Sequence, residues 1–122
     1  MTESIFDVEQ AEAALPMLRD LLPRVRDARR ALVEASERIT AAVEVDGGGV
    51  SGSDWFAAQE HLRADLTTLA EEGILLRDPE MGLVDFPAER DGRRVFLCWR
   101  LGEASVAWFH EEHTGFSRRQ PL

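Results

Sequence analysis

The residue types best suited to bind a metal ion gather near the C-terminus, in the segment His110-Glu111-Glu112-His113. Imidazole and carboxylate are ligands that divalent transition metals take, and neighbouring residues at a strand end can converge on one ion. Three-residue spacing puts two ligands on one face of a helix, but here it spans a strand end and a turn. A metal ligand and a hydrogen-bonded structural histidine therefore both stay open for His110.

Other residues of the C-terminal half could join such a site. The candidate metal ligands are His110, Glu111, His113, Asp85, Cys98 and Glu103. A divalent transition metal is the one cofactor that these residue types support. Cys98 lies between Leu97 and Trp99 and fits a small core residue equally well, because no basic partner for its thiol is identified.

A charged pair is expected on the sheet. Asp85 and Arg100 fall on the same face of two strands that pair directly, which favours a contact between them. Such a pair within a sheet is usually structural. Glu103 falls in a turn, where it could equally be exposed.

Several kinds of chemistry and partner are excluded or disfavoured. The chain has neither lysine nor tyrosine, so lysine Schiff-base chemistry and tyrosine acid catalysis are impossible. The formal net charge of -9 argues against nucleic acid or an anionic membrane as the main partner. One cysteine, no export signal and no apolar stretch long enough to span a bilayer predict a cytoplasmic protein.

The elements that must position these residues fall into two halves, and the first half, residues 1–73, reads as helix. Asp7 and Gln10 form a capping box at the start of a long amphipathic helix. The glycine-rich segment 46–53 is expected to be a loop, and a second helix ends at Gly73. The sequence therefore predicts a long antiparallel helical hairpin.

Two prolines interrupt the helical pattern. Pro16 and Pro23 each remove a backbone hydrogen bond inside a helix. They predict a break or kink near Leu15 and another bend near Leu22.

The second half, residues 74–122, changes from helical spacing to short apolar blocks between turn signals. The turn residues Asp91-Gly92 and Gly102-Glu103 predict two hairpins, and hence a three-stranded antiparallel β-meander followed by a C-terminal tail. The fold class is α+β, in a single domain of residues 1–122 with the helical hairpin packed on the meander.

The turns also predict a register, with Ala88 opposite Arg93 and Leu101 opposite Ala104. The face assigned to the helices then carries Val84, Phe86, Val95, Leu97, Trp99, Val106, Trp108 and His110. The opposite face carries Leu83, Asp85, Phe96, Cys98, Arg100, Ala107, Phe109 and Glu111. A slip of one residue in either hairpin would reshuffle these faces.

The opposite face mixes large apolar and ionisable groups, and such a face is seldom left fully exposed to solvent. The leading expectation is therefore a non-catalytic accessory or interaction domain that self-associates, through the long helix or this second sheet face, as a homodimer or other homo-oligomer. The first alternative is the metal site centred on His110, with or without enzymatic activity. The second is a small-molecule pocket between sheet and helices, lined by Trp99, Trp108 and Phe86.

The C-terminal half also resembles a known family. The matching segments are Gly82-Leu-Val-Asp-Phe-Pro-Ala88, Gly92-Arg93, Leu97-Cys-Trp-Arg-Leu-Gly-Glu103, Trp108-Phe-His110, Gly115-Phe116 and Arg119-Gln-Pro-Leu122. They resemble the bacterial family catalogued as domain of unknown function 2203, and Phe6 to Leu18 looks like its opening helix. The polar residues that match are Asp85, Arg93, Cys98, Arg100, Glu103 and His110. The resemblance implies a small cytosolic protein with a helical hairpin and a sheet, and it carries no activity over.

Overall fold

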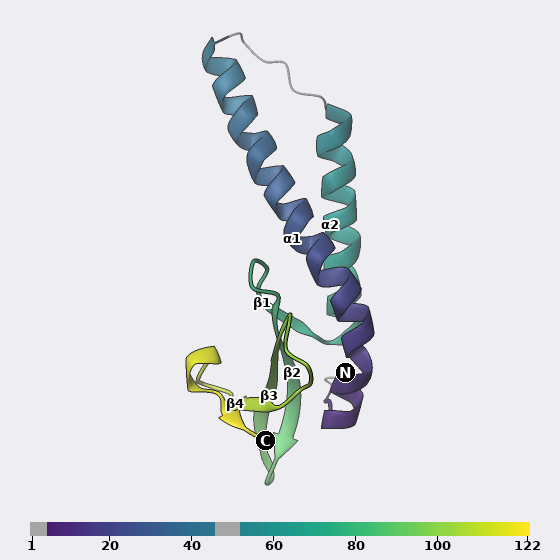
Figure 1. The fold of residues 1–122 in the computed structure, drawn as a ribbon, viewed down its shortest axis with the longest axis vertical. Coiled ribbons are helices and arrows are strands. Elements are labelled where there is room, and N and C mark those ends of the chain that lie inside the picture. The colour runs from purple at the N-terminus through teal and green to yellow at the C-terminus, as the bar shows by residue number, and fades with distance from the viewer. Residues whose placement is uncertain (1–4, 46–51) are drawn as a thin grey trace.

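The computed structural model describes residues 5–45 and 52–122 of the chain. The fold is α+β, as expected: two helices precede an antiparallel sheet (Figure 1). The elements are α1 (Val8–Val45), α2 (Gly52–Glu72), β1 (Leu75–Asp78), β2 (Leu83–Arg90), β3 (Arg93–Arg100), β4 (Trp108–Glu111), the 3-10 helix η1 (Phe116–Arg118) and β5 (Gln120–Pro121). The sheet has five strands in sequence order, so the expectation of three was too low: β1 and β5 were missed at its edges.

Helix α1 begins where the capping box predicts. The Asp7 amide donates to Oε1 of Gln10 at 2.9 Å, and the Gln10 amide donates to Oδ1 of Asp7 at 2.7 Å. The predicted break near Leu15 is wrong, because α1 continues through Pro16 and Pro23 as one helix. Each proline costs about 3 kcal/mol in a helix interior. The apolar stripe of α1 offsets this cost by packing on the sheet, with Leu15, Leu18, Leu21 and Leu22 almost fully buried.

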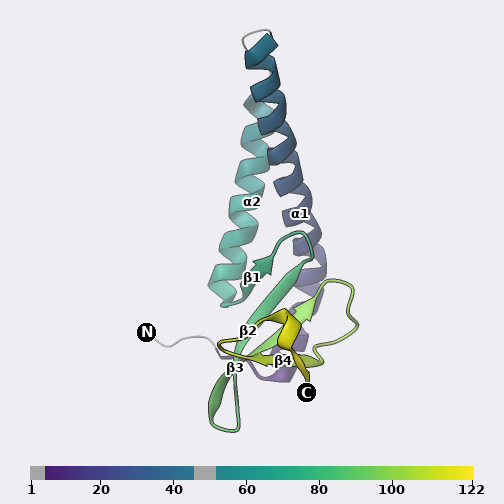
Figure 2. The same cartoon turned by 90° about the vertical axis from the view of Figure 1, so that its left-hand side faces the viewer.

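The helices and the sheet meet at one end of the molecule. Figures 1 and 2 show α1 and α2 side by side, with the sheet lying against the first part of α1. The core there is formed by Ala11, Leu15, Leu18, Leu21, Leu22 and Val25 of α1, Leu69 of α2, and the inward residues of the strands.

The end of α2 follows the prediction for Gly73. This glycine has a φ of +77°, the Ile74 amide donates to the Leu69 carbonyl, and the Gly73 amide donates to the Ala70 carbonyl. These are the two hydrogen bonds of a Schellman motif, which turns the chain from α2 into β1. Residues 46–51 of the loop predicted at 46–53 lie outside the described residues. Residues 52 and 53 belong to α2, which begins at Gly52.

The hairpin between β2 and β3 is tighter than predicted. Asp91 and Gly92 have φ angles of 53° and 78°, as in a two-residue type I′ turn, so Arg90 pairs with Arg93. The predicted pairing of Ala88 with Arg93 is wrong by two residues, since Ala88 pairs with Val95. A shift of two preserves the side on which each residue lies.

The connection between β3 and β4 differs by one residue. Leu97 pairs with Phe109, not with Trp108, so no two-residue turn at Gly102-Glu103 closes this hairpin. A longer loop runs from residue 101 to 107, and α1 holds it in place. Glu12 accepts a hydrogen bond from the Val106 amide at 2.6 Å, and Arg19 donates to the Ala104 carbonyl at 3.0 Å.

The slip moves every β4 side chain to the other face of the sheet. Phe109 joins the core against the helices, with 4% of its surface exposed. Trp108 and His110, expected on the helix face, lie on the opposite face with Cys98 and Phe96, their register partners.

Candidate functional site

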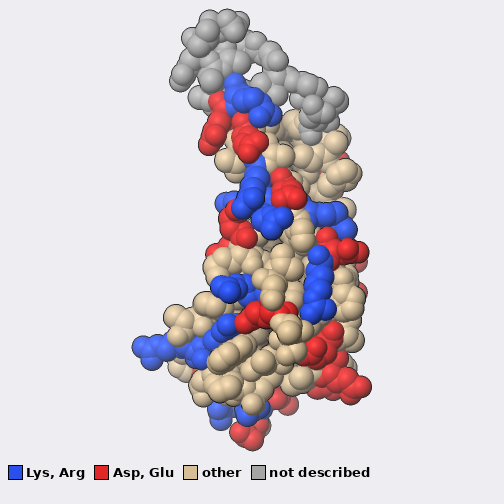
Figure 3. Space-filling model, viewed as in Figure 1, with Lys and Arg blue, Asp and Glu red and all other residues tan. Residues whose placement is uncertain are grey.

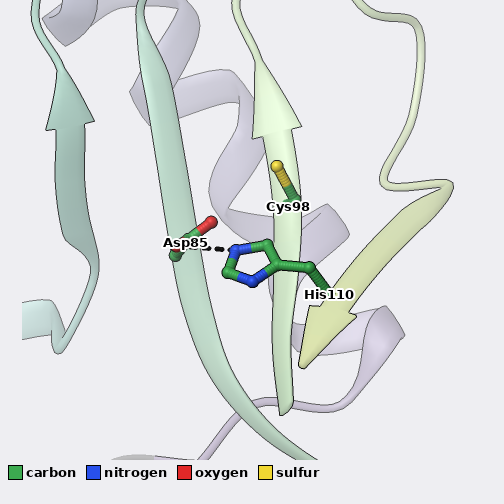
Figure 4. Close-up of side chains that lie close together, drawn as sticks. All are labelled: Asp85, Cys98 and His110. Atoms are coloured by element: carbon green, nitrogen blue, oxygen red, sulfur yellow. Dashed lines mark hydrogen bonds and ion pairs between the residues drawn. The ribbon is translucent and has the colours of Figure 1, made fainter. Parts of the chain in front are cut away.

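Three ionisable side chains converge on the face of the sheet opposite the helices. Asp85 comes from β2, Cys98 from β3 and His110 from β4, and Figure 4 shows them gathered on adjacent strands. One ligand atom from each lies within 4.8 Å of those of the other two. All three residues are at most 2% exposed. Among the described residues, this is the group whose donor atoms are arranged to hold a metal ion.

The hydrogen bonds of His110 fix how its ring is presented. Nδ1 lies 2.8 Å from the carbonyl oxygen of Glu111, which can only accept, so Nδ1 carries a proton and donates it. Nε2 lies 3.0 Å from Oδ2 of Asp85. A ring nitrogen lone pair and a carboxylate oxygen repel at this distance unless a proton or a metal ion lies between them. Nε2 is therefore the nitrogen that faces the cluster.

Asp85 is held from its other side by an arginine of β1. Nε of Arg77 donates to Oδ2 of Asp85 at 2.9 Å, the same oxygen that faces His110. Its second oxygen, Oδ1, is buried and has no hydrogen-bond partner among the described residues. A buried carboxylate oxygen without a partner is costly, which makes Oδ1 the atom of the cluster most in need of a ligand.

The thiol of Cys98 is protected from ordinary reactivity. Burial raises its pKa to about 11, and the charge of Asp85 acts in the same direction, while a hydrogen bond from Arg119 opposes them. A thiol with so high a pKa is a poor nucleophile at neutral pH. The ring nitrogens of His110 point to the Glu111 carbonyl and to Oδ2 of Asp85, so among the described residues His110 and Cys98 do not form the hydrogen-bonded pair that Cys-His catalysis uses.

The C-terminal tail covers the cluster on the side away from the helices. Strand β5 pairs with β4, and Arg119 forms two hydrogen bonds with Glu103, at 3.0 and 2.7 Å. The Arg119 guanidinium also lies 4.7 Å from the ring centre of Trp108 and 4.3 Å from that of Phe116. The face expected to need cover is therefore covered by the chain itself.

Glu103 makes hydrogen bonds with β3 as well as with the tail. Its Oε1 accepts from the Arg100 amide at 2.7 Å, and its carbonyl accepts from the Trp99 indole at 3.1 Å. Burial acts to raise the pKa of Glu103, but the hydrogen bonds from Arg119 and the Arg100 amide outweigh it, and the pKa is lowered. Glu103 serves the loop and the tail, and it is not in the convergent group.

The remaining candidate ligands also lie outside the convergent group. Glu111 pairs with Arg93 at 2.8 Å, and His113 is exposed. The predicted contact between Asp85 and Arg100 is wrong: Arg100 is paired with Leu83 across the strands, and the arginine of Asp85 is Arg77.

The residues predicted to line a small-molecule pocket are not brought together. Phe86 and Trp99 are fully buried within the core against the helices. Trp108 lies on the opposite face beneath Arg119.

Two residues of the site were missed by the sequence reasoning, Arg77 and Arg119. Arg77 sits where the pairing of β1 with β2 shifts, between Leu76 and Asp78, and no turn or periodicity signal marks that irregularity. Arg119 had only its charge as a signal, and its partner Glu103 lies sixteen residues away.

The helical part of the surface is mixed in charge. Figure 3 shows basic and acidic side chains interspersed on this face, over the helices. Three ion pairs form between such side chains. Arg24 lies 3.1 Å from Asp65, and Glu80 lies 2.7 Å from Arg30 and 3.9 Å from Arg29. Within the described residues, no helix has both the length and the apolar character needed to cross a membrane.

The fold and the cluster thus define a small α+β protein whose sheet carries a buried Asp-Cys-His group with the donors of a metal site. Comparison with protein families gives the assignment: the chain belongs to the family described as "Uncharacterized conserved protein (DUF2203)", whose model matches residues 4–122. Searches of the curated proteins and of the solved structures find no match.

Proposed function

We propose that this protein binds one divalent transition metal ion, of the zinc class, through Asp85, Cys98 and His110. The observation that carries the proposal is the convergence of an oxygen, a sulfur and a nitrogen donor within 4.8 Å in a buried place. Thiolate, imidazole and carboxylate are the ligands that zinc takes in proteins.

Two further features of the cluster favour a metal over a purely structural contact. Metal-binding histidines commonly donate their second ring nitrogen to a backbone carbonyl, as His110 does to Glu111. Oδ1 of Asp85, which has no hydrogen-bond partner within residues 5–45 and 52–122, would gain the metal ion as a partner. Donors bound to one tetrahedral ion lie about 3.3 to 3.6 Å apart. The donor atoms of the cluster lie within 4.8 Å of one another, so the widest pair would have to close by no more than about 1.5 Å.

The number of protein donors sets the character of the site. Structural zinc sites have four protein ligands, whereas sites with three keep a position for water or another small donor. Asp85, Cys98 and His110 supply three. An ion held by them would also link β2, β3 and β4, so it would stabilise the sheet.

The experiment is a metal titration of untagged protein that has been stripped with a chelator. With Co²⁺ as the probe, the expected result is one ion per chain and a thiolate-to-cobalt charge-transfer absorption in the near ultraviolet. Because the Cys98 thiol is protonated when its pKa is about 11, binding should release a proton, and affinity should rise with pH.

Matched variants separate this site from adventitious binding. Cys98→Ala, Asp85→Asn and His110→Ala should each remove stoichiometric Co²⁺ binding, whereas His113→Ala, at an exposed histidine three residues from His110, should leave it unchanged. Circular dichroism of each variant is the control for folding. Wild-type protein that takes up no stoichiometric Co²⁺ or Zn²⁺, or equal loss in His113→Ala, would refute the proposal.

A second candidate function is self-association through the helices, which we propose are the two arms of an antiparallel hairpin. The observation in its favour is apolar exposure along α1 and α2: Val33, Phe56 and Leu66 are 45%, 63% and 40% exposed. Sedimentation velocity across a concentration series tests it, with Phe56→Ser as the variant. A wild-type protein that stays monomeric at high micromolar concentration would remove this candidate.

A further inference from the structure

Arg77 stands out because its side chain joins the protein surface to the buried cluster. The side chain is 45% exposed, but its Nε donates at 2.9 Å to an Asp85 carboxylate that is only 3% exposed. The guanidinium also lies 5.1 Å from the ring centre of Phe96, whose register partner is His110. Both contacts restrict how Arg77 can be oriented.

The backbone explains how an edge-strand arginine reaches this position. Leu76 pairs with Val84 and Asp78 pairs with Leu83, so the register of β1 against β2 shifts between them, and Arg77 is the extra residue. A β-bulge of this kind turns a side chain in a new direction and is common beside functional sites. Regular pairing would place Arg77 opposite Leu83, two residues from Asp85.

The contacts of Asp85 divide its two oxygens. Arg77 and His110 both face Oδ2, while Oδ1 has no partner among the residues that the structure describes. Arg77 therefore fixes the rotation of the carboxylate and leaves one oxygen open. Without it, the carboxylate could turn about its Cβ–Cγ bond and offer either oxygen, or both.

We infer that Arg77 is the positioning residue of the metal site, holding Asp85 so that it binds the ion through one oxygen. The inference rests on the proposed metal-binding function. It assigns to Arg77 a role that acts through Asp85 and not by direct contact with the metal. Removing a residue that orients a ligand typically weakens metal binding about 10- to 100-fold.

The test compares Co²⁺ affinity and absorption spectrum in wild type, Arg77→Gln, Arg77→Lys and Arg90→Gln. Arg90 is the matched control, because its guanidinium also stacks on an aromatic ring of the sheet, Phe109, at 4.5 Å. Arg77→Gln should bind about 10- to 100-fold more weakly, with altered d–d bands as the Asp85 coordination changes. Arg77→Lys should recover part of the affinity, and Arg90→Gln should match wild type.

The outcomes separate this inference from the proposal beneath it. Wild-type protein without stoichiometric Co²⁺ overturns both. Wild-type binding with Arg77→Gln unchanged in affinity and spectrum overturns the role of Arg77 alone, as does an equal change in Arg90→Gln. If Arg77→Gln lowers the folded fraction, the Arg77→Lys variant is the deciding one, because it keeps the positive charge. If folded Arg77→Lys binds Co²⁺ as weakly as folded Arg77→Gln does, positioning by charge and hydrogen bond is refuted.

Discussion

The two faces of one sheet are buried by different means. On the face toward the helices, apolar strand side chains such as Val84, Phe86 and Leu97 pack in the core with residues of α1 and α2. The opposite face buries Asp85, Cys98 and His110 beneath a tail whose own residues are mostly exposed. A buried polar cluster costs stability unless it is fully satisfied, and Oδ1 of Asp85 has no hydrogen-bond partner in the part of the chain that the structure describes. The contrast is the one expected if the first face provides stability and the second holds the proposed metal site.

The largest expected effect tests the stabilising face. Phe86 is fully buried and packs edge-on against Phe6, with ring centres 5.2 Å apart. Phe86→Ala should lower the free energy of unfolding by about 3–5 kcal/mol, through lost burial and the cavity left behind. Urea denaturation of metal-free protein measures it.

The control for Phe86→Ala is an exposed apolar residue. Met81 is 37% exposed, and Met81→Ala should change stability by less than about 1 kcal/mol. Folded Phe86→Ala should still bind Co²⁺ one to one. Loss of metal binding from folded Phe86→Ala, or a stability change no larger than that of Met81→Ala, would contradict the assignment of stability to one face and metal binding to the other.

The next effect tests the opposite face by adding the metal. Zn²⁺ at 100 times its Kd should raise the free energy of unfolding by about 2.7 kcal/mol, because it binds the folded state. His110→Ala should abolish this gain, since it removes one of three donors. His61→Ala, at an exposed histidine on α2, should retain it. Equal gains in wild type and His110→Ala would show that Zn²⁺ stabilises the protein from elsewhere.

The faces also differ in how well the sequence predicts them. Two local signals were reliable: the capping box of Asp7 and Gln10 and the end of α2 at Gly73 both depend on hydrogen bonds between near neighbours. On β2 and β3 the predicted helix face was right despite the wrong register, because an error of two residues keeps side chains on the same side. On β4 it was wrong, because the error there was one residue and Phe109 replaces Trp108 and His110.

The site depends on a contact that local signals do not reveal. Gly102-Glu103 has the residues of a tight turn, but the chain forms a longer loop, whose Val106 amide donates to Glu12, 94 residues away in the sequence. The resulting one-residue difference in the β3–β4 register places His110 on the same face as Asp85 and Cys98, whereas the sequence predicted the other face for it. The same kind of long-range packing carries α1 through Pro16 and Pro23, where propensity alone predicts a break.

A third prediction uses the alkaline pH range, where the buried thiol affects stability. The pKa of Cys98 is raised from 9.0 to about 11 in the folded chain, so between these values the unfolded chain loses a proton that the folded chain keeps. Stability of metal-free protein should therefore fall as pH rises through this window, by up to about 1.4 kcal/mol per pH unit. The chain has no lysine or tyrosine, and arginines stay charged, so the thiol dominates.

Cys98→Ala is the control for the alkaline prediction. Its stability, measured by urea denaturation across the same pH values, should be nearly flat between about 9 and 11, because the group that titrates there is gone. An equally steep fall in Cys98→Ala would mean that the thiol is not the cause.

The smallest expected effect concerns the tail that covers the site. Arg119 and Glu103 form a partly buried pair worth about 1 kcal/mol, so its loss should raise the open population of the tail about fivefold. Arg119→Gln should then release Co²⁺ to an excess of chelator several times faster than wild type. Arg118→Gln, at the exposed neighbouring residue, should match wild type.

The rate and the affinity should respond differently to loss of this pair. A cover that opens more often speeds both the binding and the release of the ion, so the Kd should change less than the release rate, whereas loss of Arg77 should change the Kd itself. Release from Arg119→Gln at the wild-type rate would mean that the tail does not limit access. The second face would then be closed by the packing of the sheet residues themselves, and the difference between the faces would lie in their chemistry alone.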